Sequence, residues 1–313
     1  MGDNLGKAVA FDGSVRLTDW ALLRAHGADA AAFLQSQLTQ DVAGLQQGEA
    51  RLSGYCSPKG RLLASFIIWR MSVDEFALLC SADVAAAARK RLSMFVLRAR
   101  CRIDDAAAQW SVFGIAGDSA APWASLDVRP WTVRRQADQW LIGLSTVEQV
   151  PRWLLVQPVG MDAPALPTLS AQAWQLLEVM SGVPRITAAT ADRFVPQMIN
   201  FEIVGGVHFQ KGCYPGQEVV ARSQYRGTIK RRMHLFATSG STQPGQEVFH
   251  NDDAAQPAGM VVNSAELAGS GTRLLAEVKL AALDSGSLHL GTVDGPVLQR
   301  LPLPYPIADL AHA

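Results

Sequence analysis

The chain has 313 residues, of which 49% are hydrophobic, 18% are charged and 7% are aromatic. This composition excludes an intrinsically disordered chain, and the length corresponds to roughly two domains of about 150 residues. The 28 basic and 28 acidic residues cancel, so the overall charge indicates no class of partner, and an anion site requires a local cluster of cations.

The start of the chain and its cysteines bear on where the protein acts. Residues 1–7 contain no basic segment followed by an apolar one, and the apolar run at residues 62–69 is far shorter than the roughly 20 residues that span a membrane. The four cysteines are scattered and lack the C-x-x-C spacing of metal sites. We therefore expect a cytoplasmic chain with reduced thiols, without a membrane span and without a metal site.

The first third of the chain alternates extended and helical patterns. Extended segments are predicted at residues 15–17, 62–71, 76–80, 100–104 and 110–115. The second and third of these form a hairpin, because only a short polar link separates them. Apolar residues at helical spacing predict a helix over residues 29–38 and another after Ser81. Together these elements indicate a βα unit with mixed strands.

The rest of the chain contains one clear helix and a series of short strands. Ser170 is expected to cap a helix that ends at Gly182 and Pro184, in the usual glycine-then-proline order. Further strands are predicted at residues 139–143, 233–237, 260–263, 274–278 and 288–290. The last four, separated by turn residues, predict a small antiparallel barrel.

Residues 211–222, KGCYPGQEVVAR, combine a thiol, a phenol and two glycines with the expected start of a helix. The positive end of that helix, together with Lys211 and Arg222, would lie near Cys213. These are conditions that lower the pKa of a thiol and make it reactive. The alternative is that Cys213 is a small buried hydrophobic residue. Glu218 either orients a ligand nitrogen or complements the helix dipole.

A run of cations without an acid follows, at Arg222, Arg226, Lys230, Arg231 and Arg232. It is either a strip that attracts phosphates or a ligand carboxylate, or a solvated face at a domain junction. Tyr225 is the one aromatic residue within the run, so a dedicated nucleic-acid platform has little support. The sequence lacks the motifs of P-loop nucleotidases, dinucleotide enzymes and α/β-hydrolases.

The KGCYPGQEVVAR run resembles the most specific motif of the YgfZ family of folate-binding proteins, which are related to the aminomethyltransferase (T-protein) of the glycine cleavage system. Further blocks that resemble this family occur in the expected order at residues 19–21, 27–29, 35–42, 58–61, 182–184, 194–197, 200 and 303–305. The resemblance therefore covers nearly the whole chain.

This resemblance implies an α+β fold, an aminomethyltransferase-like ring of three domains around an opening for tetrahydrofolate or a one-carbon derivative. It implies a ferredoxin-like mixed α/β insertion and a C-terminal antiparallel β-barrel. We expect residues 1–53 plus 106–228 to form the folate-binding domain in two segments, residues 54–105 the insertion, and residues 229–313 the barrel.

The resemblance also implies site residues. Two tryptophans match positions that contact folate in the family, where the flat indole suits a flat ring; the alternative for each is ordinary core packing. The implied functional thiol is that of Cys213. The implied cofactor-binding residues are Trp20, Trp174, Lys211, Tyr214, Gln217, Glu218 and Arg222.

One departure from the pattern of aminomethyltransferases affects the expected activity. Ala64 and Ser65 stand where those enzymes carry an acid, so we expect no aminomethyltransferase activity. The resemblance implies a tetrahydrofolate-binding accessory protein that supports assembly or repair of iron–sulfur enzymes, including radical enzymes that modify tRNA, with such enzymes or assembly factors as partners. Two alternatives are a folate-dependent transferase or demethylase that uses another base, and a tRNA-binding module acting through Arg222 to Arg232.

Overall fold

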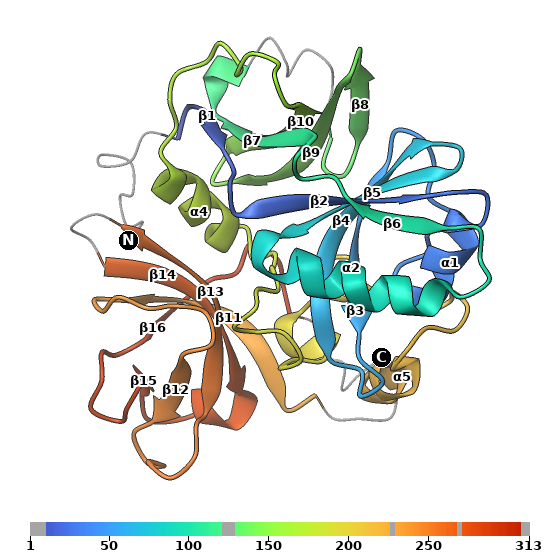
Figure 1. The fold of residues 1–313 in the computed structure, drawn as a ribbon. Coiled ribbons are helices and arrows are strands. Elements are labelled where there is room, and N and C mark those ends of the chain that lie inside the picture. Colours follow the sequence, from blue (N-terminus) through green and yellow to red (C-terminus); the bar gives the residue numbers. More distant parts are fainter. Residues whose placement is uncertain (1–10, 121–128, 226–228, 268–270, 308–313) are drawn as a thin grey trace.

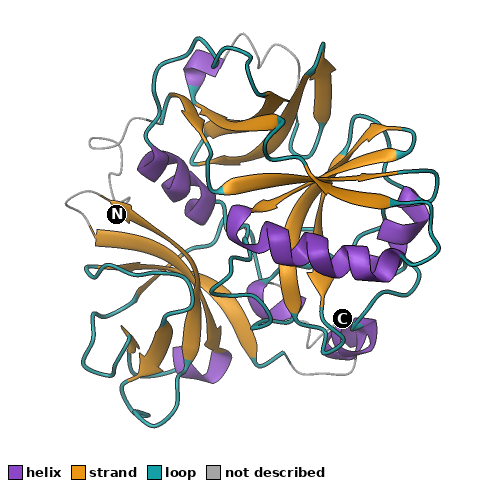
Figure 2. Cartoon of the chain, in the orientation of Figure 1, coloured by secondary structure: helices purple, strands orange, loops and turns teal. Residues whose placement is uncertain are grey.

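Antiparallel sheets make up most of the protein (Figures 1 and 2). The structure, a computed structural model, describes residues 11–120, 129–225, 229–267 and 271–307. Within these residues the strands form three sheets, accompanied by a few helices. No helix of this part of the chain is long and apolar enough to cross a bilayer.

The first sheet has the strand order β3-β4-β5-β2-β6. Its strands are β2 (Trp20–His26), β3 (Ala50–Cys56), β4 (Leu62–Ser72), β5 (Glu75–Ser81) and β6 (Arg102–Asp105). Helices α1 (Ala30–Gln37) and α2 (Ala82–Val96) pack on one face, where Phe66 and Ile68 of β4 meet them. Ile67 and Trp69 face the other way into a second core. Both faces of β4 are buried, which explains its continuous apolar run.

The expected hairpin β4–β5 and the helix over residues 29–38 are confirmed, but two other expectations differ from the structure. The first sheet contains β2 and the whole of β3, and it therefore includes residues well before residue 54. Every ladder in it is antiparallel, where mixed strands were expected. The reason is that β2 inserts between β5 and β6, a pairing between distant segments that local periodicity does not encode.

The second sheet has the strand order β1-β7-β10-β9-β8. Its strands are β1 (Gly13–Arg16), β7 (Trp110–Ala116), β8 (Val133–Gln136), β9 (Gln139–Val147) and β10 (Val150–Pro158), with the short 3-10 helix η2 (Asp118–Ala120) after β7. Helix α4 (Ala171–Met180) follows and lies between this sheet and the third (Figure 1). The hydroxyl oxygen of Ser170 accepts a hydrogen bond from the Ala173 N–H, so the predicted cap is confirmed.

The third sheet has the strand order β15-β12-β13-β14-β11-β16. Its strands are β11 (Arg231–Thr238), β12 (Glu247–His250), β13 (Gly259–Leu267), β14 (Gly271–Lys279), β15 (Leu288–Leu290) and β16 (Gln299–Leu301), with the 3-10 helices η3 (Pro196–Ile199) before it and η4 (Leu280–Leu283) within it. Among the described residues no ladder joins β15 to β16. The expected barrel is therefore a half-barrel.

One face of each sheet contributes to a shared core. This core contains Trp69 of the first sheet, Leu154 of the second, Leu235 of the third and Trp174 of α4. The three sheets thus surround a common centre. The cavity described in the next subsection is lined by residues of all three sheets.

Candidate functional site

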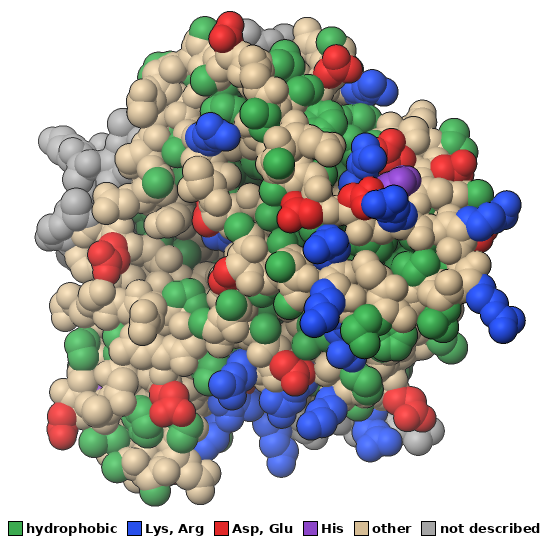
Figure 3. Space-filling model, in the orientation of Figure 1, with side chains coloured by type: hydrophobic (Ala, Val, Ile, Leu, Met, Phe, Trp, Pro, Cys, Tyr) green, Lys and Arg blue, Asp and Glu red, His purple; other side chains and the backbone are tan. Residues whose placement is uncertain are grey.

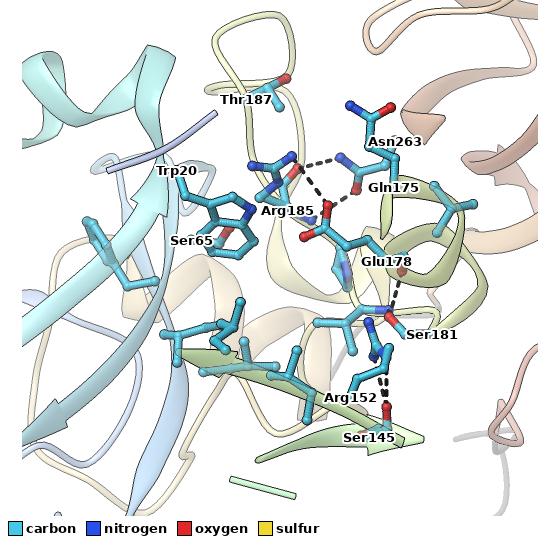
Figure 4. A pocket seen from close by; sticks show the side chains of 18 of the residues that line it. Trp20, Ser65, Ser145, Arg152, Gln175, Glu178, Ser181, Arg185, Thr187 and Asn263 are labelled. Carbon is cyan, nitrogen blue, oxygen red and sulfur yellow. Dashed lines mark hydrogen bonds and ion pairs between the residues drawn. The ribbon is translucent and has the colours of Figure 1, made fainter. Parts of the chain in front are cut away.

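A cavity of about 240 Å³ lies where the three sheets meet (Figure 4). Its walls come from β2, β3 and β4, from β9 and β10, from α4 and the segment after it, and from β13. Most of the lining is apolar, but Glu178, Arg152 and Arg185 bring three charges into it. A small apolar cavity with a few convergent polar groups has the form of a ligand site.

Glu178 presents its carboxylate to the cavity from the last turns of α4 (Figure 4). The helix directs it there because Ala173, Leu176 and Leu177 of the same helix occupy the core. Glu178 forms an ion pair with Arg185 at 3.7 Å. Burial raises the pKa of the Glu178 carboxyl, and the charge of Arg185 opposes that rise.

Arg185 contacts residues from several walls of the cavity. Its guanidinium is 2.6 Å from the Asp19 carboxylate, and its Cζ lies 4.6 Å from the centroid of the Trp20 ring. Its backbone N–H donates to Asn263 Oδ1, and Asn263 Nδ2 donates to its carbonyl oxygen. Arg185 therefore fixes β2, the segment after α4 and β13 relative to one another. Trp20 lines the cavity, and its buried indole N–H has no hydrogen-bond partner among the described residues.

Arg152 is a buried cation, 4% exposed, that lines the cavity from β10. Its Nε and Nη2 both donate to the Ser145 carbonyl oxygen, at 3.0 and 2.9 Å. No carboxylate of the described chain lies within ion-pair distance of it, and Glu178 acts on it only at longer range. Burial lowers the pKa of Arg152 to about 10. A buried guanidinium with unused donors is suited to a ligand group that accepts hydrogen bonds.

Trp174 does not line the cavity. It is 1% exposed and packs against β7, where a Cβ on Gly114 would lie 2.5 Å from its ring. The structure thus separates the two predicted tryptophans, with Trp20 at the cavity and Trp174 in the core. The prediction that Trp174 contacts the ligand directly is not supported by this placement, because the side chain on α4 points toward the second sheet.

Ser65 and Ala64 lie on opposite faces of β4. Ser65 lines the cavity, and its Oγ accepts a hydrogen bond of 2.9 Å from the Ile186 N–H. Ala64 packs in the core beneath α1 and α2. No carboxylate therefore extends into the cavity from this part of β4.

The loop at residues 211–216 lies outside the cavity, at the start of α5 (Gln217–Tyr225). Lys211 Nζ donates to the carbonyl oxygens of Gln35 and, at 2.5 Å, of Leu38, which lie at the end of α1. This contact anchors the loop to the C-terminal, negative end of a helix. Burial lowers the pKa of Lys211 to about 8.

Tyr214 and Cys213 have opposite environments within this loop. Tyr214 is buried, with Lys211 Nζ 5.1 Å from its ring centroid, and burial raises the pKa of its phenol. Cys213 is exposed, so the alternative of a buried structural cysteine is wrong. The expected helix start after Gly216 is confirmed, and Gly216 has a φ of +79° that favours glycine.

The other predicted residues of the motif lie on α5. Gln217 is partly exposed, and Glu218 and Arg222 are exposed without an ion pair to described residues. The motif residues are therefore grouped around Cys213 on the surface, apart from Trp20 in the cavity. The structure divides the single predicted site into two places.

The predicted cationic strip is not continuous at the surface. Arg231 pairs with Glu277, and Arg232, 3% exposed, pairs with Glu202. The Arg232 guanidinium also donates to the Gln197 carbonyl oxygen, so this side chain holds the half-barrel against η3. Arg231 instead pairs with β14 within the third sheet. Arg222 and Lys230 are exposed, and Arg226 lies outside the described residues.

Sequence reasoning missed the charged residues of the cavity. Each stands in an otherwise apolar setting, Arg152 in the strand VPRWLLVQP and Glu178 in the helix AQAWQLLEVM. A charge within an apolar run is the signal that could have identified them. In the described residues no cluster of three or more His, Cys, Asp or Glu side chains could hold a metal ion.

Comparison with known proteins gives concordant matches. Residues 13–125 match the GCVT N-terminal domain family. The chain is 28% identical over 94% of its length to the tRNA-modifying protein YgfZ of Sodalis glossinidius, and it covers 93% of that protein. It is 30% identical over 73% of its length to the protein of the same name from Aliivibrio fischeri, and covers 72% of it.

The fold matches a solved structure as well. The aminomethyltransferase T of the glycine cleavage system from Bartonella henselae superposes with a TM-score of 0.74, covering 94% of this chain and 86% of the other. The two sequences are 16% identical, so this likeness establishes the fold alone.

Proposed function

The chain belongs to the YgfZ family, and on this premise we propose that it is a tetrahydrofolate-binding accessory protein that supports tRNA modification. It does so in the cytoplasm by assisting the assembly or repair of iron–sulfur enzymes that modify tRNA. The three sheets then correspond to a ring of domains around the cavity. The single observation that carries the proposal is that the Glu178 carboxylate and the Arg152 guanidinium, which form no ion pair with each other, line the same cavity.

The charged residues of the cavity fit the pterin ring of tetrahydrofolate. This flat ring presents two adjacent N–H donors, from its 2-amino group and N3, and a carbonyl oxygen at position 4. The Glu178 carboxylate would accept from the two donors, the unused donors of Arg152 would bind the carbonyl oxygen, and Trp20 offers an aromatic face.

The size of the cavity limits what it encloses. Its volume of about 240 Å³ is below the range of about 300–1,000 Å³ typical of pockets that enclose drug-sized ligands. The cavity therefore takes the ring and leaves the aminobenzoyl-glutamate portion outside. Pro244, which lines both the cavity and a neighbouring polar hollow at residues 241–246, marks the side on which that portion leaves.

Bound tetrahydrofolate supplies one-carbon and redox chemistry, and this chain's residues hold and desolvate its ring. With Ser65 in place of a carboxylate on β4, we propose that the chain performs no aminomethyl transfer. Cys213 provides the exposed thiol through which the protein acts on its client enzymes.

Exchange of Cys213 for serine tests the role of the thiol. Cys213→Ser is expected to abolish restoration of an iron–sulfur tRNA-modifying enzyme in a strain that lacks this protein. Because Cys213 is exposed, the free energy of unfolding should change by less than about 0.5 kcal/mol. Enzyme activity in extracts and urea denaturation of the purified variant measure the two effects.

Cys101→Ser is the matched control, since Cys101 is another free thiol that is partly exposed, but it directly precedes β6 of the first sheet. It should restore activity fully. Full restoration by Cys213→Ser would reject the proposed role of this thiol.

A further inference from the structure

Five exposed cations lie on segments that surround or follow the Cys213 loop. They are Lys59, Arg61, Arg193, Arg222 and Lys230, and we call them the basic cluster. None of them forms an ion pair with a described residue. By contrast, the neighbouring Arg231 and Arg232 are neutralised by Glu277 and Glu202.

The packing of the β3–β4 turn brings the first members of the cluster together. Arg61 Nη1 donates to the carbonyl oxygen of Arg193 at 3.1 Å. A Cβ on Gly60 would lie 2.8 Å from the Val219 Cβ, so the turn that carries Lys59 touches the first turn of α5. Arg222 lies one turn further along that helix.

Figure 3 shows Lys and Arg side chains gathered at the lower edge of the molecule, where Figure 1 places α5, the β3–β4 turn and the start of β11. Two exposed acids, Asp192 and Glu218, lie on the same segments. The Asp192 carboxylate already accepts a hydrogen bond from the Ser57 hydroxyl. The surface therefore keeps an excess of positive charge although the whole chain is neutral.

An exposed aromatic ring accompanies these cations. Tyr225, at the end of α5, is 70% exposed, and the Phe209 ring supports it edge-on with 6.0 Å between centroids. Val219, 37% exposed, is the other large apolar side chain exposed on this helix. So little exposed apolar area does not suit a lipid surface or the apolar centre of a protein interface. Cations beside one exposed ring suit single-stranded nucleic acid.

We propose that the basic cluster and Tyr225 bind a single-stranded segment of RNA, such as a tRNA loop, across the surface that exposes Cys213. The cations contact phosphates, and one unstacked base lies on the Tyr225 ring. The inference rests on the proposed function only for the identity of the RNA. It gives the chain a second site, distinct from the cavity, that would place the thiol beside the RNA undergoing modification.

The test measures binding of an unmodified tRNA transcript by fluorescence anisotropy at several salt concentrations. The cluster variant Lys59→Gln, Arg193→Gln, Arg222→Gln removes three charges whose side chains form no hydrogen bond to described residues. At 0.1 M salt it should bind about 100-fold more weakly, with a salt dependence shallower by about two in log–log slope.

A matched control removes three cations, also exposed and without an ion pair to described residues, from α2 and the residues after it. Arg89→Gln, Lys90→Gln, Arg98→Gln changes the net charge by the same amount and should leave RNA affinity and its salt slope unchanged. Tyr225→Ala should weaken binding about 5- to 150-fold, whereas Tyr225→Phe, which keeps the stacking face, should bind like the unmodified chain.

Equal losses in the two triple variants would overturn the proposal, because binding would then reflect overall charge. Absence of RNA binding, or binding of the cluster to anionic phospholipid vesicles in preference to RNA, would overturn it too. Tetrahydrofolate titration of the same proteins separates this failure from failure of the proposed function. The cluster variant should bind tetrahydrofolate as tightly as the unmodified chain. If the unmodified chain did not bind tetrahydrofolate, that result would contradict the proposed function but not the proposed RNA site.

Discussion

Replacing Glu178 by glutamine is expected to weaken tetrahydrofolate binding by about 10- to 150-fold, since hydrogen bonds to a charged group contribute about 1.5–3 kcal/mol. The substitution keeps the size of the side chain and removes the charge that accepts the two ring donors. Arg185 keeps its ion pair with Asp19, so the walls of the cavity should stay in place. Anaerobic calorimetry measures the affinity, and urea denaturation verifies the fold.

The pH dependence of binding provides a second measure of Glu178. Burial raises the pKa of its carboxyl, and only the ionised form accepts both donors. Affinity should therefore be highest at neutral pH and fall as pH decreases, beginning at a higher pH than an ordinary glutamate would cause. The Glu178→Gln variant should lack this dependence. An affinity that is independent of pH in both proteins would contradict the assignment.

Arg152 supplies the matched control for the orientation of the ring. Arg152→Met should weaken binding of tetrahydrofolate but not of its 4-amino counterpart, which has no acceptor oxygen at position 4. The unmodified chain should prefer the 4-oxo ligand. The variant should lose the part of this preference that Arg152 provides, whereas the part due to the N3–H that Glu178 accepts, which the 4-amino ring lacks, should remain. If the substitution lowered the affinity for both ligands equally, Arg152 would stabilise the cavity without contacting the ring.

Replacing Trp174 by alanine is expected to lower the free energy of unfolding by about 3–5 kcal/mol, the cost of a large cavity in a core. The ring is 1% exposed and fills the space over Gly114 between α4 and β7. The effect should appear in urea denaturation without ligand. Any loss of folate affinity should follow from unfolding.

Trp20→Ala distinguishes core packing from ligand contact. Trp20 is only partly buried and lines the cavity, so its replacement should reduce folate affinity with a smaller loss of stability. The two variants should thus differ in which property they change. A Trp174→Ala protein with unchanged stability and lost folate binding would contradict the placement of this ring.

The local elements of this fold were predictable where a short segment carries its own signal. Ser170 and Gly182 delimit α4, and Gly216 precedes α5, because caps and glycine conformations act within a few residues. The pairing of β2 with β5 and β6 was not predictable, because it joins strands that are far apart in the sequence. For the same reason, the sequence did not show that the first sheet includes β2.

The candidate site shows the same division. The motif around Cys213 was identified because its residues are contiguous, and the exposure of the thiol agrees with the reactive alternative. The cavity could not be identified from the sequence, because Arg152 and Glu178 are brought together only when α4 packs beside the second sheet. Likewise, burial of Arg232 against Glu202 follows from tertiary packing and cannot be read from a run of cations.

The most direct test of the central claim is anaerobic calorimetric titration of the unmodified chain with tetrahydrofolate. We predict saturable binding at one site per chain that weakens in Glu178→Gln and in Trp20→Ala. Absence of saturable binding by the folded protein, or binding that neither substitution changes, would contradict the assignment of the cavity to folate.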